Sequence, residues 1–321
     1  LATTILFELT GVLLLLLVFV PVHGFYEGLW YSVFHSINAF NNAGFSLYSD
    51  GLVRYVNSPI LTLVMSGLII FGGLGYDVIM EIYYWLEGKI KKRQELWIFS
   101  LHFKVVTTTT LFLLGLGLIV FFIVEFNDQE TLAPLNFGGK MLAAWFQSVT
   151  TRTAGFNTIN IGELTDAGLF MTIALMFIGA SPGSTGGGIK TTTLRILLNC
   201  TKAGLRGDDE VICYQRKIPT ATIIKAIGVV CGSALAVTIS TILIASSDPK
   251  LELFPIFFEV VSAFATVGLS MGITSSFSTV SQLVLVATMY VGRVGVLILM
   301  ATILGETKVR VVQYPEENLL V

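Results

Sequence analysis

Six long apolar stretches constrain this chain more than any other feature of its sequence. They cover residues 1–20, 58–86, 97–124, 166–199, 219–246 and 279–304. A helix of roughly 20 mostly apolar residues is long enough to cross the hydrocarbon layer of a membrane. Mean hydropathy is +0.80, and only 12% of the residues are charged, which is about half the charged share of a typical soluble domain. We therefore expect an all-α membrane protein with several spanning helices.

Composition also excludes several classes of function. The formal net charge is −2, and no basic field indicates nucleic acid as a partner. Cys200, Cys213 and Cys231 are too few and too scattered for a disulfide framework or a metal site. The sequence shows no nucleophile placed with a base, as the active site of an enzyme would require. The first apolar run, which begins at Leu1, has no small-residue cleavage site after it, so we expect a spanning helix in a chain that lacks its true start rather than a signal peptide.

Shorter apolar stretches lie between the members of each pair of long ones, at 28–41, 136–149 and 252–264. They are too short to span a membrane and are candidates for re-entrant helices. Each is followed by a similar tripeptide: Asn42-Ala43-Gly44, Thr153-Ala154-Gly155 and Thr266-Val267-Gly268. The recurrence predicts three copies of one helix–pore loop–helix unit. We assign them to residues 1–87, 97–201 and 219–305, with a cytoplasmic tail at 306–321.

Basic residues indicate how these units are oriented. They cluster after the second long segment of each unit, at Lys89, Lys91, Lys92, Arg93, then Lys202, Arg206, Arg216, Lys217, and finally Lys308 and Arg310. If the six segments alternate in direction, all three clusters fall on one side, which the excess of positive charge marks as cytoplasmic. The glycine-bearing loops then lie on the outer side, where basic residues are sparse (Arg54, Lys140, Arg152, Lys250).

The three tripeptides are candidates for an ion selectivity filter. Irregular backbone at membrane depth is tolerated only where it is buried in protein or lines a wet cavity. Potassium filters are rings of backbone carbonyls with the sequence TVGYG, and Thr266-Val267-Gly268 reproduces its first three letters. A single glycine could equally belong to an ordinary tight turn, but three aligned copies favour a filter that passes potassium. Glu259, in the third short stretch, is either an acid that supports this filter or a simple polar contact.

A glycine-rich stretch at 179–193 interrupts the fourth long segment. A phosphate-binding loop would need G-x-x-x-x-G-K-[ST], but Ile189 separates Gly188 from Lys190. A kinked helix is the plain alternative. We favour a gate below the filter, formed by Gly183, Ser184, Thr185, Gly186, Gly187, Gly188 and Lys190. Arg293, midway through the last segment, is either a partner for backbone carbonyls or, as we favour, a fixed positive charge beside the ion pathway.

The filter tripeptides, the run from Gly183 to Lys190 and Gly292-Arg293-Val294-Gly295 together resemble the Trk/Ktr/HKT superfamily of potassium transporters. The resemblance covers nearly the whole chain and is greatest for the KtrB membrane subunits, with TrkH-type subunits next. It implies potassium uptake in a bacterial plasma membrane, through a single-chain pseudo-fourfold pore with a gating loop. It further implies homodimers on a cytosolic ring of KtrA or TrkA type, which would bind ATP and ADP. Sodium is a possible coupling ion, and no covalent cofactor is expected.

The chain departs from that superfamily in one respect. The superfamily has four repeats, whereas three are evident here, so we expect the first repeat to be absent from this sequence. Three quadrants cannot close a fourfold filter. This leaves open a sodium-selective or sodium–potassium symporting relative, favoured if the missing first filter carried serine. A second alternative, based on the glycine-rich stretch, is a membrane-embedded enzyme or sensor that binds phosphate or nucleotide at 183–191.

Overall fold

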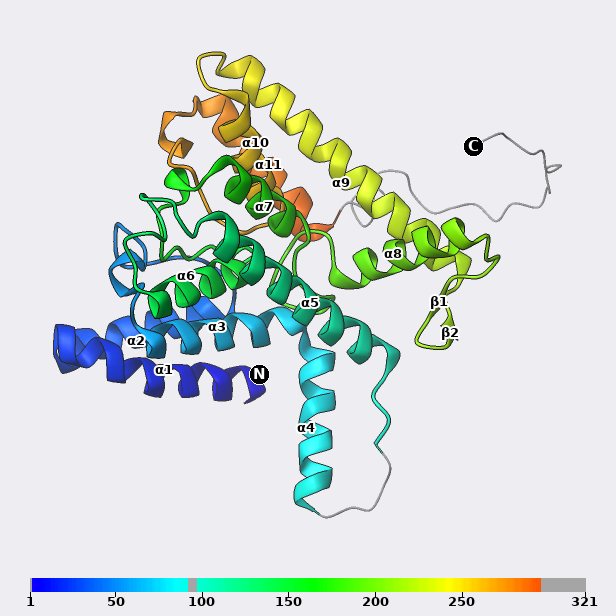
Figure 1. Ribbon diagram of the computed structural model, residues 1–321, viewed down its shortest axis with the longest axis horizontal. Helices are drawn as coiled ribbons and strands as arrows, with labels where there is room; N and C mark the ends of the chain where they lie inside the picture. The colour runs from blue at the N-terminus through cyan, green and yellow to red at the C-terminus, as the bar shows by residue number, and fades with distance from the viewer. Residues whose placement is uncertain (1, 92–96, 296–321) are drawn as a thin grey trace.

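The computed structural model describes residues 2–91 and 97–295 (Figure 1). The predicted tail, with Lys308 and Arg310, and the end of the sixth long segment lie outside the described residues, as do Lys92 and Arg93. The helices are α1 (Ala2–His23), α2 (Phe25–Phe40), α3 (Pro59–Leu74), α4 (Tyr76–Ile90), α5 (Leu101–Val124), α6 (Phe137–Thr150), α7 (Asp166–Phe177), α8 (Thr191–Arg206), α9 (Thr220–Ser247), α10 (Leu253–Phe264) and α11 (Thr279–Val294). Three short 3-10 helices are η1 (Val53–Tyr55), η2 (Ile161–Glu163) and η3 (Thr274–Ser276).

The prediction of an all-α membrane protein is confirmed. Within the described residues, α1, α5 and α9 are each long and apolar enough to cross a membrane, and α3 with α4 passes the same test as a bent pair. The sheet found there is a single hairpin of β1 (Ile212–Cys213) and β2 (Arg216–Lys217), in which Ile212 pairs with Lys217. Helices therefore supply almost all of the ordered backbone, as the lack of water in a bilayer requires.

Each third of the chain runs through the same order of elements. A long helix leads into a short one, and a glycine-bearing loop follows before the next helix: α1–α2–α3, α5–α6–α7 and α9–α10–α11. Small residues let the first two helices of a set pack closely. On α2, Ser36 Oγ donates to the Glu8 carbonyl oxygen at 2.7 Å, and on α6, Ser148 Oγ donates to that of Leu114 at 2.8 Å.

The stretch 58–86, which the sequence predicts as one span, is divided at Gly75. Helices α3 and α4 meet there at an angle of 105°, and Gly75 has a φ of 92°. A Cβ at Gly75 would lie 2.5 Å from the carbonyl oxygen of Pro182, so the bend follows a close approach to a distant part of the chain. Hydropathy alone could not show it, because both halves of the stretch are apolar.

The fourth long stretch is interrupted between α7 and α8. Residues 178–190 are not helical, although Ile178 and Ile189 are joined by a parallel bridge. Two apolar cores flank the glycine-bearing loops. One includes Phe258 and Phe264 of α10, and the other includes Phe19 of α1 and Phe146 of α6. The loops and the interruption thus lie at the centre of the molecule.

Candidate functional site

The structure brings the three predicted filter tripeptides together. A Cβ on Gly44 would lie 2.6 Å from the carbonyl oxygen of Ala154 and 3.2 Å from Cα of Gly155. A Cβ on Gly155 would overlap the carbonyl oxygen of Val267. The first loop therefore touches the second, and the second touches the third, although more than a hundred residues separate them in sequence.

The sign of the backbone angle φ alternates along each tripeptide. The first residues have positive φ angles of 50° at Asn42, 74° at Thr153 and 53° at Thr266. The third residues do too: Gly44 has 73°, Gly155 83° and Gly268 93°, whereas the middle residues do not. An alternation of this kind can turn successive peptide carbonyls to the same side of an extended segment, as in a carbonyl-lined filter. That arrangement suits a row of oxygen ligands for a dehydrated cation.

Two of the tripeptides begin as helix C-terminal caps. After α2, Asn42 N–H donates to the carbonyl oxygen of Ala39 at 3.2 Å, and Ala43 N–H donates to that of Asn38 at 2.9 Å. After α10, the equivalent bonds join Thr266 to Ala263 at 3.1 Å and Val267 to Ser262 at 2.9 Å. This is the Schellman pattern, whose left-handed position usually holds glycine.

A threonine in that left-handed position is strained. Positive φ is a genuine outlier for a β-branched residue, and such strain concentrates at functional sites. Thr153 and Thr266 both adopt it. The loop after α6 is held differently, because the carbonyl oxygen of Thr150 accepts from Ala154 N–H at 3.0 Å and from Gly155 N–H at 3.3 Å.

The three short helices present their C-terminal ends to these loops. Each tripeptide starts within three residues of the end of its short helix, which is Phe40 for α2, Thr150 for α6 and Phe264 for α10. The C-terminal end of a helix carries partial negative charge and stabilises a nearby cation. The three ends therefore add a favourable field at the place where the loops meet.

The interrupted segment lies directly against this meeting point. A Cβ on Gly186 would overlap Oγ1 of Thr153, and a Cβ on Gly187 would overlap Oγ1 of Thr266. Thr185 Oγ1 lies 3.3 Å from the carbonyl oxygen of Phe40, at the end of α2. Three consecutive residues of the predicted gate thus contact all three units. The rest of it adjoins them: Ser184 Oγ donates to the Ser181 carbonyl oxygen at 2.6 Å, while Gly183 and Gly188 have φ of 69° and 70°.

Three basic side chains donate to carbonyl oxygens of the interrupted segment. Lys190 Nζ donates to Gly186 at 2.6 Å, Arg293 Nη1 donates to Thr185, and Arg152 Nη2 donates to Gly179 at 3.3 Å. The sequence placed Arg152 among the sparse basic residues of the outer side. The structure instead buries it, with 7% of its surface exposed. The sequence carried no signal for this burial, since Asn41, at the equivalent position before Asn42, is exposed.

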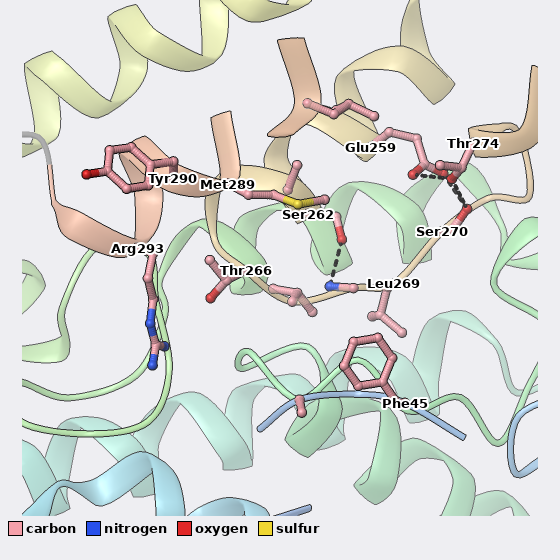
Figure 2. Close-up of a pocket in the computed structure, with 15 residues that line it drawn as sticks. Phe45, Glu259, Ser262, Thr266, Leu269, Ser270, Thr274, Met289, Tyr290 and Arg293 are labelled. Atoms are coloured by element: carbon pink, nitrogen blue, oxygen red, sulfur yellow. Dashed lines mark hydrogen bonds between the residues drawn. The ribbon is translucent and has the colours of Figure 1, made fainter. Parts of the chain in front are cut away.

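The third tripeptide borders an open cavity of about 590 Å³. Thr266, Val267 and Gly268 line it on one side, and Ala43 and Phe45 of the first unit line it on another. Arg293 and Glu259 lie at opposite ends of this space (Figure 2). The first and third loops are therefore separated by a gap, whereas the other neighbouring loops touch. Among the described residues, no group of three or more His, Cys, Asp or Glu side chains could hold a metal ion.

A family model described as the TrkH cation transport protein matches residues 1–307. Ktr system potassium uptake protein B of Vibrio alginolyticus is 36% identical over 314 residues, which cover 98% of this chain and 67% of the relative. The protein of the same name from Bacillus subtilis is 38% identical, with 96% and 67% covered. Potassium/sodium uptake protein NtpJ of Enterococcus hirae is 37% identical, with 98% and 69% covered. The chain thus spans about two thirds of the length of these relatives.

A solved structure has the same fold. The potassium transporter TrkH from Vibrio parahaemolyticus superposes with a TM-score of 0.72 at 17% sequence identity, over 92% of this chain and 62% of the TrkH chain. That likeness concerns the arrangement of helices and pore loops. It agrees with the short helices and loops described above.

Proposed function

The chain belongs to the TrkH family of cation transport proteins, and we propose that it takes up potassium through a selectivity filter of backbone carbonyls. Its family and its relatives are ion transporters rather than enzymes. The single observation that carries the proposal is the meeting of three loops of alternating hand at the C-terminal ends of three short helices. Such a site can replace the hydration shell of a monovalent cation without any charged ligand.

Potassium is the ion we favour, because the relatives from Vibrio alginolyticus and Bacillus subtilis carry it in their names. Sodium, transported or coupled, is the second candidate, since NtpJ is named for both ions. The filter residues of this proposal are Asn42, Ala43, Gly44, Thr153, Ala154, Gly155, Thr266, Val267 and Gly268.

We further propose that residues 183–190 form an intramembrane gate. The argument is steric, because Gly186 and Gly187 touch the first residues of two filter loops and so lie across the inner end of the filter. Arg293 supports closure in two ways. It holds the segment through Thr185, and its positive charge raises a barrier to cations in a medium of low dielectric constant. The phosphate-binding alternative is weaker, since Lys190 is already bonded to Gly186.

A fourth helix–pore loop–helix unit would complete the ring in this proposal. The cavity beside Gly268 separates the first and third loops, and the relatives are about half as long again as this chain. Residues 1–87, 97–201 and 219–305 would then be the second, third and fourth quadrants of a pseudo-fourfold pore.

The partners of the transporter are proposed from its relatives and its shape. The two KtrB-type relatives are named as parts of a Ktr system, so we expect a homodimer on a cytosolic ring of KtrA or TrkA type that binds ATP and ADP. Helix α8 and the β1–β2 hairpin extend together at one end of the molecule (Figure 1). They carry Lys202, Arg206, Arg216 and Lys217, which fits the cytoplasmic side of a bacterial plasma membrane.

Uptake by the intact protein in liposomes tests this function. Rubidium or potassium entry, driven by a potassium gradient, should exceed entry into empty liposomes and should be preferred over sodium. Gly115 supplies a control, because a Cβ there meets nothing within 4 Å, and Gly115→Ala should transport normally. Flux that does not distinguish the protein from empty liposomes would overturn the proposal, and a preference for sodium would replace potassium with the second candidate.

A further inference from the structure

Glu259 is a buried acid that the filter proposal leaves without a role. It lies on α10, and only 6% of its surface is exposed. The structure describes α2, α6 and α10 completely, and Glu259 is the one buried Asp or Glu in these three short helices. A carboxylate removed from water is strongly unfavourable unless it is paired or hydrogen-bonded. Its partners therefore indicate why the site keeps an acid.

Both carboxylate oxygens of Glu259 accept bonds from one short segment, residues 270–274. Ser270 Oγ donates to Oε1 at 2.6 Å, and Met271 N–H donates to the same oxygen at 2.9 Å. Thr274 Oγ1 donates to Oε2 at 3.0 Å. Figure 2 shows the carboxylate turned toward the two hydroxyls. This segment begins two residues after Gly268, so Glu259 secures the outer continuation of the third filter loop.

The same helix holds the filter glycine itself. Gly268 N–H donates to Ser262 Oγ at 3.2 Å, a bond drawn in Figure 2. Glu259 and Ser262 lie three residues apart and therefore on the same face of α10. Together they connect the helix to the loop at Gly268 and again at 270–274. We propose that Glu259 is a positioning residue, which fixes the third loop at the width that selects potassium over sodium; this inference rests on the proposed filter.

Among the residues that the structure describes, the other two units show no acidic side chain in the place of Glu259. Ser270 follows Glu259 by eleven positions. At the same spacing in the first unit, His35 Nε2 and Ser46 Oγ lie 3.4 Å apart. In the second unit the corresponding short-helix residue is Phe146, which is fully buried. Hydrogen bonds to an ionised group are about twice as strong as neutral ones. The third loop is thus held by charge-assisted bonds on a side where the filter borders the 590 Å³ cavity.

A carboxylate could also act simply by attracting cations, and the two roles make different predictions. Attraction needs the charge alone, whereas positioning needs the bonds to 270–274. The double variant Ser270→Ala/Thr274→Val keeps the charge and removes two of the three donors. If Glu259 is a positioning residue, the double variant should lose selectivity nearly as much as Glu259→Ala, and combining all three changes should add little.

The experiment measures uptake by the intact protein, with potassium KM and sodium inhibition determined for each variant. Glu259→Ala should lower the preference for potassium over sodium about tenfold, at an unchanged amount of protein in the membrane. Glu259→Gln should restore part of it, because its amide oxygen can still accept from Met271 N–H. The control is Glu252→Ala, which removes the exposed acid at the start of the same helix and should leave the preference unchanged.

Two results would overturn the inference: wild-type selectivity in both Glu259→Ala and Glu259→Gln, or additive losses in the combined variant. If Glu259→Ala fails to reach the membrane, Glu259→Gln and the double variant still decide between the roles. Gly155→Ala separates this inference from the filter itself. Wild-type selectivity in Gly155→Ala would refute the filter, whereas a loss there with none at Glu259 would refute only the positioning role.

Discussion

Alanine at each of the three filter glycines tests the ring geometry directly. Alanine at positive φ costs about 1–2 kcal/mol, which alone reduces the population of the native loop by about 5–30-fold. At Gly155 the added Cβ would also overlap the carbonyl oxygen of Val267, and overpacking of that kind costs about 1–3 kcal/mol more. At Gly44 the Cβ would lie 2.6 Å from the carbonyl oxygen of Ala154. We therefore expect alanine at Gly155 or Gly44 to destabilise the native conformation of the loop by about 2–5 kcal/mol.

Gly268 differs from the other two in the described surroundings. Its added Cβ meets nothing closer than Cα of Gly155 at 4.0 Å, so only the conformational penalty of about 1–2 kcal/mol applies there. A fourth unit in the gap would place a carbonyl against Gly268, as the second and third units do for Gly44 and Gly155. The ring proposal thus predicts that Gly268→Ala is as harmful as Gly155→Ala in the intact protein.

Potassium uptake in a bacterial strain without its own potassium transporters provides the assay, with sodium competition as the measure of selectivity. Gly115→Ala is the matched control, and the amount of each variant in the membrane is determined in parallel. If Gly155→Ala transports with wild-type selectivity, carbonyls at this position do not set it and the reasoning fails. If Gly268→Ala alone has little effect on uptake and selectivity, the filter proposal is retained but the closed ring is refuted.

Three further predictions concern the interrupted segment and its contacts. Deletion within 183–188 should increase potassium flux in the absence of a regulatory partner, measured in liposomes, because the residues that touch Thr153 and Thr266 are removed; unchanged flux would argue against a gate. Arg293→Gln should likewise raise the rate of flux at unchanged selectivity, since it removes the charge but not the filter; a lower rate would contradict a barrier. Gly75→Ala should lower the melting temperature, because φ is 92° and the Cβ would lie 2.5 Å from the carbonyl oxygen of Pro182. Gly88→Ala, in the open on α4, should instead be neutral or stabilise by about 0.5–1 kcal/mol, and equal effects of the two would refute the contact.

The sequence predicted the helices well because membrane helices follow hydropathy. It also placed the glycine tripeptides at the ends of the short helices, since that order recurs in all three units. The bend at Gly75 was not predictable, because it depends on Pro182, more than a hundred residues away. The burial of Arg152 depends on the same long-range packing, through its bond to Gly179. Positive φ at Thr153 and Thr266 contradicts the local backbone preference of a β-branched residue, so only the structure could reveal it.

Arg152, Lys190 and Arg293 connect the requirements of the backbone with those of ion passage. An interrupted helix leaves carbonyl groups without partners, and at membrane depth these groups need donors. The three basic side chains donate to the carbonyl oxygens of Gly179, Gly186 and Thr185. A hydrogen bond to a charged group contributes about 1.5–3 kcal/mol. Serine or threonine could have donated as well, as Thr185 does to Gly72. What the basic side chains add is positive charge on the segment that contacts the filter. In a gate, those charges would oppose a cation while the bonds hold the segment in place, so opening would have to break the bonds and move the charges together.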